Sequence, residues 1–303
     1  MKTLPPPFSN RIQAVFGDQG RSWLEEFPAL RADFRQRWML QDPQPIPSLS
    51  YNYLETALTA SGQPVVLKLG VPNRELDNEI RALQFYAGGS AARLLEADPK
   101  RGALLLERII PGTDLGALET DQQAARIAGQ LMTRLWKPAP PGIDLPSAGD
   151  WCRGFERYRE RYQVADGPLP VRMVADAGSL AAELLADGRQ DLLLHGDLHH
   201  GNILLREDQS WAAIDPKGVL GEPSFEVGPF LYNPIPEFLA RPHPERLLES
   251  RLADLVETTG LDRKRMAAWS FCRAVLSAVW SLEDNQPSPS YAVRFARLLQ
   301  SFL

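Results

Sequence analysis

The spacing of apolar residues divides the first part of the chain into a helix followed by strands. Between Ser22 and Leu40 apolar residues recur every three or four positions, interrupted by Pro28, and this period predicts a helix. Residues 5–7 are all proline and predict an extended arm before it. The segments Leu49–Leu58 and Pro64–Leu69 flank a short polar turn and predict two paired strands.

The next segments complete a small sheet. Apolar residues at helical spacing predict a helix over Arg74–Tyr86, and two apolar runs, Leu94–Leu95 and Ala103–Ile109, predict the last strands. The following sequence, Ile110–Asp114, contains proline and glycine, which end a strand. We therefore expect one domain at residues 1–109 and a second at 110–303.

Helical periods dominate the second domain. Helices are predicted over residues 121–136, 151–162, 171–185, 244–260, 262–284 and 288–303. A small N-terminal part with a sheet and a larger helical part together indicate the α+β class.

Composition narrows the possible functions. The chain has 303 residues, of which 44% are hydrophobic, so it can bury a sizeable core. Its net charge of -5 argues against nucleic-acid binding and suits a cationic ligand. Cys152 and Cys272 lie too far apart in sequence to suggest a metal motif. No uncharged apolar run approaches the roughly 18 residues of a membrane helix, so we expect a cytoplasmic protein that binds no membrane.

The candidate chemistry lies between two short apolar runs. Leu192–Leu194 leads directly into His195-Gly196-Asp197, Asn202 follows five residues later, and the run Trp211–Ile214 ends on Asp215. A path of loop, hairpin and loop would bring Asp197, Asn202 and Asp215 to one end of a small sheet. Mg²⁺ prefers such oxygen ligands and usually keeps phosphate or water oxygens as well. One carboxylate is then left to act as a base.

These residues also carry a resemblance to a known family. The sequence HGDLHHGN from His195 resembles the catalytic loop of the aminoglycoside phosphotransferases, relatives of protein kinases, and IDPKG from Ile214 resembles their metal-binding segment. The run DPKG, with GEPSFEVGPFLYNP beyond it, is similar to the streptomycin 6-kinase and hydroxyurea resistance kinase branch.

The resemblance implies a protein-kinase-like fold of two lobes, with a small N-terminal lobe of antiparallel sheet plus helix and a larger, mainly helical C-terminal lobe. It implies an enzyme that uses ATP and Mg²⁺ to phosphorylate a hydroxyl of a small polar or cationic molecule such as streptomycin. Asp197 would be the catalytic base, and Asn202 and Asp215 would bind Mg²⁺. We expect a monomer or a weak homodimer.

The small lobe offers candidates for nucleotide binding. Lys68 ends a β-branched run that resembles the lysine strand of protein kinases, with Glu79 as its expected partner and Glu75 as the competitor. Backbone groups around Glu107 to Ile109 would meet adenine. The loop of Ser48 to Tyr53 lacks the G-x-G-x-x-G pattern, but Ser50 could still meet phosphate oxygens.

The acceptor side rests on fewer residues. Glu226, just beyond the metal-binding segment, could contact guanidinium groups of an acceptor, since carboxylates bind such planar cations well. His200 could also line the acceptor site. A solvated acidic residue and a loop histidine bonded to the backbone are the alternative interpretations.

Other functions stay open at this point. A housekeeping metabolite kinase would share every motif, because the fold does not determine the acceptor. A nucleotide-binding pseudokinase would not need the full set of polar residues. The motifs could also be ordinary turn sequences. A metallophosphoesterase could use His195, Asp197, His199 and His200, but the chain has only four histidines for such a metal shell.

Overall fold

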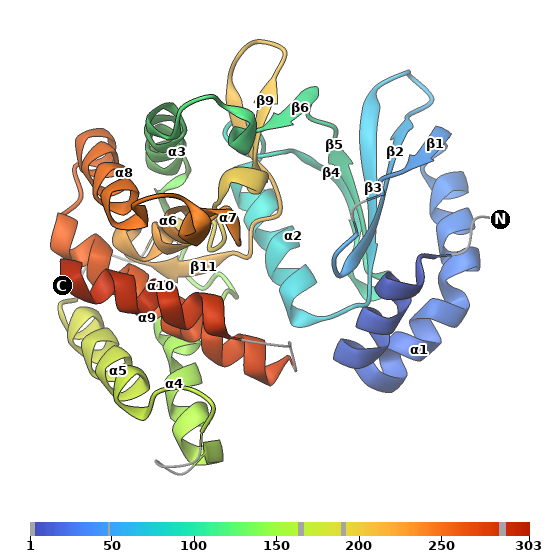
Figure 1. Cartoon of the computed structure of the whole chain (residues 1–303). Coiled ribbons are helices and arrows are strands. Elements are labelled where there is room, and N and C mark those ends of the chain that lie inside the picture. Colours follow the sequence, from blue (N-terminus) through green and yellow to red (C-terminus); the bar gives the residue numbers. More distant parts are fainter. Residues whose placement is uncertain (1–3, 48, 163–166, 189–191, 285–288) are drawn as a thin grey trace. The chain divides into compact units, whose positions relative to one another are not determined.

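The computed structural model describes residues 4–47, 49–162, 167–188, 192–284 and 289–303 (Figure 1). The chain divides after Ile110 into two compact units, here called unit 1 and unit 2. Within the described residues, no helix combines the length and the apolar character that crossing a membrane requires.

Unit 1 is built on a five-stranded antiparallel sheet in the order β1-β2-β3-β5-β4 (Figure 1). The strands are β1 (Gln41–Pro45), β2 (Asn52–Leu58), β3 (Pro64–Gly70), β4 (Leu94–Asp98) and β5 (Ala103–Glu107). Its helices are α1 (Pro6–Arg37) and α2 (Arg74–Tyr86). The sheet and α2 were predicted from the sequence, whereas β1 was missed.

The two faces of this sheet are covered by different helices. Side chains alternate along a strand, so Leu67 and Leu69 of β3 face one way and join a core with the aromatic residues of α1. Val66 faces the other way, and with Leu104 and Leu106 it packs against α2. Lys68 has the same parity as Val66 and therefore points towards α2.

Helix α1 differs from the sequence prediction in two ways: it includes the prolines at its start, and it is not interrupted at Pro28. It begins at Pro6, with Pro5 at its N-cap, so the prolines start the helix instead of forming an extended arm. Proline is tolerated in a first helical turn because its missing N–H would have no partner there. The helix bends at Gly17, whose φ of 54° and ψ of -127° are not helical, and continues past Pro28.

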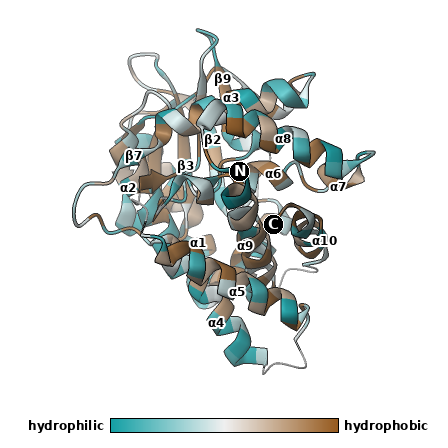
Figure 2. Ribbon diagram, turned by 90° about the vertical axis from the view of Figure 1, so that its left-hand side faces the viewer, coloured by the Kyte–Doolittle hydropathy of each residue, from teal (hydrophilic) through white to brown (hydrophobic). Residues whose placement is uncertain are grey.

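Unit 2 is mainly helical. Its helices are α3 (Asp121–Leu135), α4 (Ala148–Tyr162), α5 (Val171–Ala186), α6 (Gly228–Tyr232), α7 (Glu237–Ala240), α8 (Pro244–Thr259), α9 (Arg263–Glu283) and α10 (Ser290–Leu299). Helix α9 is the central element, because it packs against α4, α5, α6, α8 and α10. Accordingly, most of its residues are buried, whereas α4 and α5 alternate hydrophobic and hydrophilic segments along their length (Figure 2).

Two small sheets complete unit 2. One has the order β10-β9-β6, with β6 (Pro111–Asp114), β9 (Ile203–Arg206) and β10 (Trp211–Ala213). The other has the order β11-β8-β7, with β7 (Lys137–Pro138), β8 (Leu192–Leu194) and β11 (Val219–Gly221). Asp197 follows β8, whereas Asn202 and Asp215 flank the β9–β10 hairpin. The expectation that all three leave one small sheet is therefore wrong.

Candidate active site

Two hydrogen bonds, one from a side chain and one from the backbone, join the segments of the three predicted oxygen-bearing residues, although these segments leave different sheets. The Asn202 side-chain Nδ2 donates to the carbonyl oxygen of Asp197 at 2.9 Å. The Ile214 N–H donates to the carbonyl oxygen of Asn202 at 2.9 Å, which brings Asp215 beside Asn202. Asp197, Asn202 and Asp215 are each half-buried, so the structure gathers them in one place that a ligand can reach.

His195 connects these segments from inside the protein. Its Nδ1 accepts from the Asp197 N–H at 3.2 Å, so its Nε2 carries the proton and donates to the Ile214 carbonyl oxygen at 2.8 Å. Burial lowers the pKa of His195 to about 4. A neutral His195 therefore ties the segment before Asp215 to the loop of Asp197.

Glu226 supports the same loop through hydrogen bonds to its backbone. The His195 N–H donates to its Oε2 at 2.6 Å, and the Gly196 N–H donates to its Oε1 at 3.0 Å. Burial raises the pKa of Glu226 to about 7, although the Gly196 N–H and the charge of Arg273 act in the opposite direction. Glu226 is 1% exposed, so the prediction that it contacts the acceptor is wrong. Its carboxylate holds the backbone next to Asp197.

A glycine is required at the centre of this loop. Gly196 has a φ of 85°, a conformation that side chains rarely adopt. A Cβ at this position would lie 2.9 Å from the Trp151 ring. The His-Gly-Asp sequence thus meets both the backbone geometry and the close packing of the loop.

Asn202 and Asp215 fit a magnesium ion. Because the Nδ2 of Asn202 is held by Asp197, its Oδ1 remains as the acceptor. Asp215 has a φ of 58°, which aspartate tolerates better than most residues. Two protein oxygens are few for a preformed metal cage, and no group of three or more His, Cys, Asp or Glu in the described part of the chain could hold a metal. The pair suits Mg²⁺, which takes its other ligands from phosphates and water.

Unit 1 contains the predicted ion pair. The Nζ of Lys68 lies 2.7 Å from Oε1 of Glu79, and both residues are buried. Glu79 shares the sheet-facing side of α2 with Leu76, Ile80 and Leu83, as helical spacing requires. The ion pair therefore forms with Glu79, the expected partner, whereas Glu75 is exposed.

The other nucleotide candidates of unit 1 lie at strand ends. The Glu107 N–H donates to the Arg93 carbonyl oxygen at 2.9 Å, and its Oε2 accepts from the Arg93 N–H at 3.0 Å. Ile109 is buried two residues beyond β5. Ser50 is exposed, and its carbonyl oxygen accepts from Arg11 of α1 at 3.0 Å. Ser48, from which the expected phosphate loop begins, lies outside the described residues.

His200 is not placed to line an acceptor site. It is 5% exposed, and its ring stacks on Phe230 with centroids 4.5 Å apart. Burial, with the charge of Arg251 as a smaller cause, lowers the pKa of His200 to about 3. The prediction that His200 contacts the acceptor is therefore wrong, because the ring forms part of the core beneath the loop.

Glu222, the other acidic residue of this segment, is also structural. Both of its oxygens accept from Nε of Arg265 at 2.7 Å, and Trp269 donates to Oε1. Glu222 and Glu226 both make internal contacts, so neither is available to bind the guanidinium groups of an acceptor.

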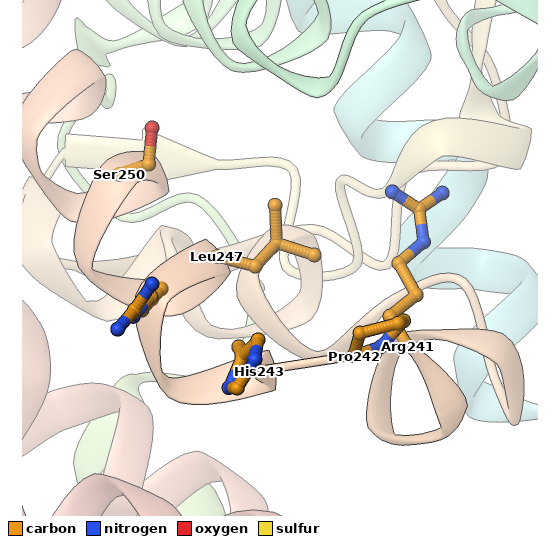
Figure 3. A pocket seen from close by; sticks show the side chains of 6 residues that line it. Arg241, Pro242, His243, Leu247 and Ser250 are labelled. Atoms are coloured by element: carbon orange, nitrogen blue, oxygen red, sulfur yellow. The ribbon is translucent and has the colours of Figure 1, made fainter.

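A shallow groove lies at the start of α8, and Figure 3 shows the side chains that line it. Its volume is about 500 Å³, and its lining residues are Arg241, Pro242, His243, Arg246, Leu247 and Ser250. The groove carries two arginines and no carboxylate, so it does not suit a cationic acceptor.

Two further residues near the loop of Asp197 were not predicted from any sequence pattern. The Nη2 of Arg273 in α9 donates to the Gly196 carbonyl oxygen at 2.6 Å. Burial raises the pKa of Tyr232 to about 12, while the charge of Arg273 opposes this shift and that of Asp197 adds to it. Only the packing of α9 and α6 against the loop reveals them.

The fold is that of the protein-kinase-like phosphotransferases. An aminoglycoside phosphotransferase solved with ADP and hygromycin B matches with a TM-score of 0.64 and 14% identity, covering 89% of this chain and 96% of that one. At this identity the match supports the fold alone, and it confirms the predicted α+β class.

Sequence comparison gives the family. The model of the aminoglycoside/hydroxyurea antibiotic resistance kinases matches residues 37–285. A streptomycin 6-kinase of Streptomyces glaucescens is 34% identical over 93% of this chain and 92% of its own length. A hydroxyurea phosphotransferase of Kitasatospora aureofaciens is 35% identical over 93% of this chain and 82% of its own length. The chain belongs to the aminoglycoside/hydroxyurea antibiotic resistance kinase family, as its two motifs predicted.

Proposed function

We propose that this protein transfers the γ-phosphate of ATP to a hydroxyl of streptomycin or a closely related cationic aminoglycoside. The observation that carries the proposal is the hydrogen-bonded grouping of Asp197, Asn202 and Asp215, which come from two loops that flank the β9–β10 hairpin. Phosphoryl transfer needs positioned reactants and charge stabilisation more than covalent help. A grouping of one base and two metal-binding oxygens supplies both.

Asp197 is the proposed catalytic base. It would orient the acceptor hydroxyl and take its proton, while the backbone contacts of His195 and Glu226 hold the loop still. Asn202 and Asp215 are the proposed magnesium ligands. The ion that they would hold supplies positive charge that stabilises the phosphates during transfer. This assigns unit 2, residues 111–303, the catalytic and acceptor-binding role.

Unit 1 is the proposed nucleotide-binding lobe. Lys68 would steady the phosphates, and Glu79 would fix the direction of its ammonium group. Backbone groups from Glu107 to Ile109 would contact adenine, and Ser50 lies in the loop proposed to meet the phosphates. The buried Lys68–Glu79 pair supports this reading, because burying two charges is costly unless they are paired. A pseudokinase would have no use for the whole set.

Streptomycin is the preferred acceptor because the first of the relatives described above is a streptomycin 6-kinase that aligns over nearly its full length. Hydroxyurea is the second candidate, supported by a relative of similar identity. Hydroxyurea is a small neutral hydroxyl compound that needs no acidic pocket, and neither Glu222 nor Glu226 is available to form one.

The test is ATP consumption by the purified protein with Mg²⁺ in the presence of streptomycin, of hydroxyurea, or of neither. We expect streptomycin to stimulate turnover and to gain one phosphoryl group by mass spectrometry. If hydroxyurea alone stimulates turnover, the proposed reaction stands and hydroxyurea takes the place of streptomycin as the acceptor. Turnover that neither compound stimulates would contradict the proposal, and release of phosphate from simple esters would favour a phosphoesterase.

A further inference from the structure

Arg273 occupies an unusual environment in the middle of α9. It is 3% exposed, and its guanidinium carbon lies 4.7 Å from the ring centroids of Trp151 and Phe225 and 5.5 Å from that of Trp280. Its Nε and Nη1 have no hydrogen-bond partner among the residues that the structure describes. Aromatic faces attract a guanidinium, but they leave its direction largely open. Hydrogen bonds give it its direction: Nη2 donates to the Gly196 carbonyl oxygen at 2.6 Å, and the Tyr232 side chain also hydrogen-bonds with the guanidinium.

That contact lies next to the proposed base. Gly196 immediately precedes Asp197, and its N–H is held by Glu226 while its carbonyl is held by Arg273. The peptide groups on both sides of Gly196 are thus fixed by two buried, oppositely charged side chains. Glycine tolerates more backbone conformations than other residues, so these contacts act together with the bond from the Asp197 N–H to His195 Nδ1 to set the conformation of the loop.

We propose that Arg273 is a positioning residue for phosphoryl transfer, which it serves by fixing the Gly196 carbonyl and thereby the direction of the Asp197 side chain. The inference rests on the proposed function, in which Asp197 is the base. Arg273 does not touch the reactants, because aromatic rings and the loop backbone enclose it. Its effect should therefore fall on the rate of transfer and leave ATP binding alone.

Arg273 has a second effect through Glu226. The charged groups acting on Glu226 are Arg273 from α9, which favours its ionised form, and Asp197 from the loop, which opposes it. The ionised carboxylate accepts from both the His195 and the Gly196 N–H groups, whereas a protonated carboxyl carries an O–H donor on one of these two oxygens. Removal of Arg273 should raise the pKa of Glu226 further, so a higher pH would be needed to keep the loop in place.

The test compares Arg273→Met with Arg265→Met. Methionine keeps the length and apolar stem of arginine but removes the charge and the donors. Arg265 is a matched control, because it is also buried in α9 and bonded to a buried glutamate, Glu222, whereas its other side-chain hydrogen bonds go to Asp187 and the Leu184 carbonyl oxygen. Both variants should lose stability. Arg273→Lys, which keeps the charge and a donor group, provides a milder change if Arg273→Met does not fold.

Two measurements are made on each full-length variant. The first is kcat and KM with MgATP and streptomycin from pH 6 to 9, at a temperature where each variant is folded. We expect Arg273→Met to lower kcat about 100-fold and Arg273→Lys about tenfold, with KM for ATP within about twofold of wild type. The acid limb of the kcat profile should move to higher pH in Arg273→Met and stay in Arg265→Met.

The second measurement is amide hydrogen exchange of the His195–Asp197 segment, which needs neither ATP nor an acceptor. We expect exchange about tenfold faster or more in Arg273→Met and unchanged in Arg265→Met. If both variants behave alike in exchange and in pH profile, the positioning role is overturned. If wild type transfers no phosphate but the exchange difference is present, the proposed function fails while the hold of Arg273 on the loop stands.

Discussion

Replacement of Glu226 by glutamine distinguishes loop support from acceptor binding. The carboxylate accepts the His195 N–H at 2.6 Å and the Gly196 N–H at 3.0 Å, and it is 1% exposed. A glutamine amide has a single oxygen, so its NH₂ group must face one of these two N–H donors. The substitution therefore removes one charge-assisted bond and leaves a buried donor without an acceptor.

The magnitude follows from these contacts. A hydrogen bond to a charged group contributes about 1.5–3 kcal/mol, and the orphaned donor adds about 1–3 kcal/mol, while relief of the buried charge offsets part of the loss. We expect the free energy of unfolding to fall by about 2 kcal/mol. Displacement of Asp197 by even about 1 Å should lower kcat about 100-fold, and KM for ATP and for streptomycin should change little.

The assay is steady-state kinetics of Glu226→Gln with MgATP and streptomycin, together with urea unfolding. A large rise in the acceptor KM with unchanged kcat would refute the reasoning. It would mean that Glu226 binds the acceptor, as its place in the sequence first suggested, and that the buried contacts to His195 and Gly196 do not govern catalysis.

Two further predictions concern stability. Burial would raise the pKa of Glu55, but hydrogen bonds from Arg35 and Tyr53 and the charge of Arg31 hold it below its usual value. Glu55→Gln weakens these contacts between α1 and β2, so it should lower the free energy of unfolding in urea by about 3 kcal/mol. An unchanged unfolding curve would contradict this. Because His200 has a folded pKa of about 3, unfolding between pH 3 and 6.5 takes up a proton there, and stability falls as the pH falls. His200→Phe should remove this contribution, about 1.4 kcal/mol per pH unit, and an unchanged slope of unfolding free energy against pH would refute it.

Local sequence patterns predicted the elements whose burial is periodic. Helix α2 has the predicted bounds, Arg74–Tyr86, because one side of it faces the sheet along its whole length. Strand β1 was missed because Pro43 and Pro45 argue against a strand, and the structure tolerates them at the edge of the sheet, where a missing N–H costs little.

The candidate site was predictable where its chemistry lies close together in sequence. Asp197, Asn202 and Asp215 follow short apolar runs, and Lys68 and Glu79 lie on neighbouring elements. The roles of Glu222 and Glu226 could not be predicted, because their partners lie 43 and 31 residues away and only the packing of unit 2 brings them together. The sequence alone does not show whether a carboxylate binds a ligand or accepts hydrogen bonds from the backbone.

The central claim is that Asp197 and Asp215 perform different tasks in one phosphoryl transfer. The most direct measurement compares Asp197→Ala and Asp215→Ala by streptomycin phosphorylation and by magnesium-dependent ATP binding. We predict that Asp197→Ala lowers kcat by orders of magnitude while ATP still binds, whereas Asp215→Ala also weakens the magnesium-dependent binding. Small and equal effects of the two substitutions would contradict the account.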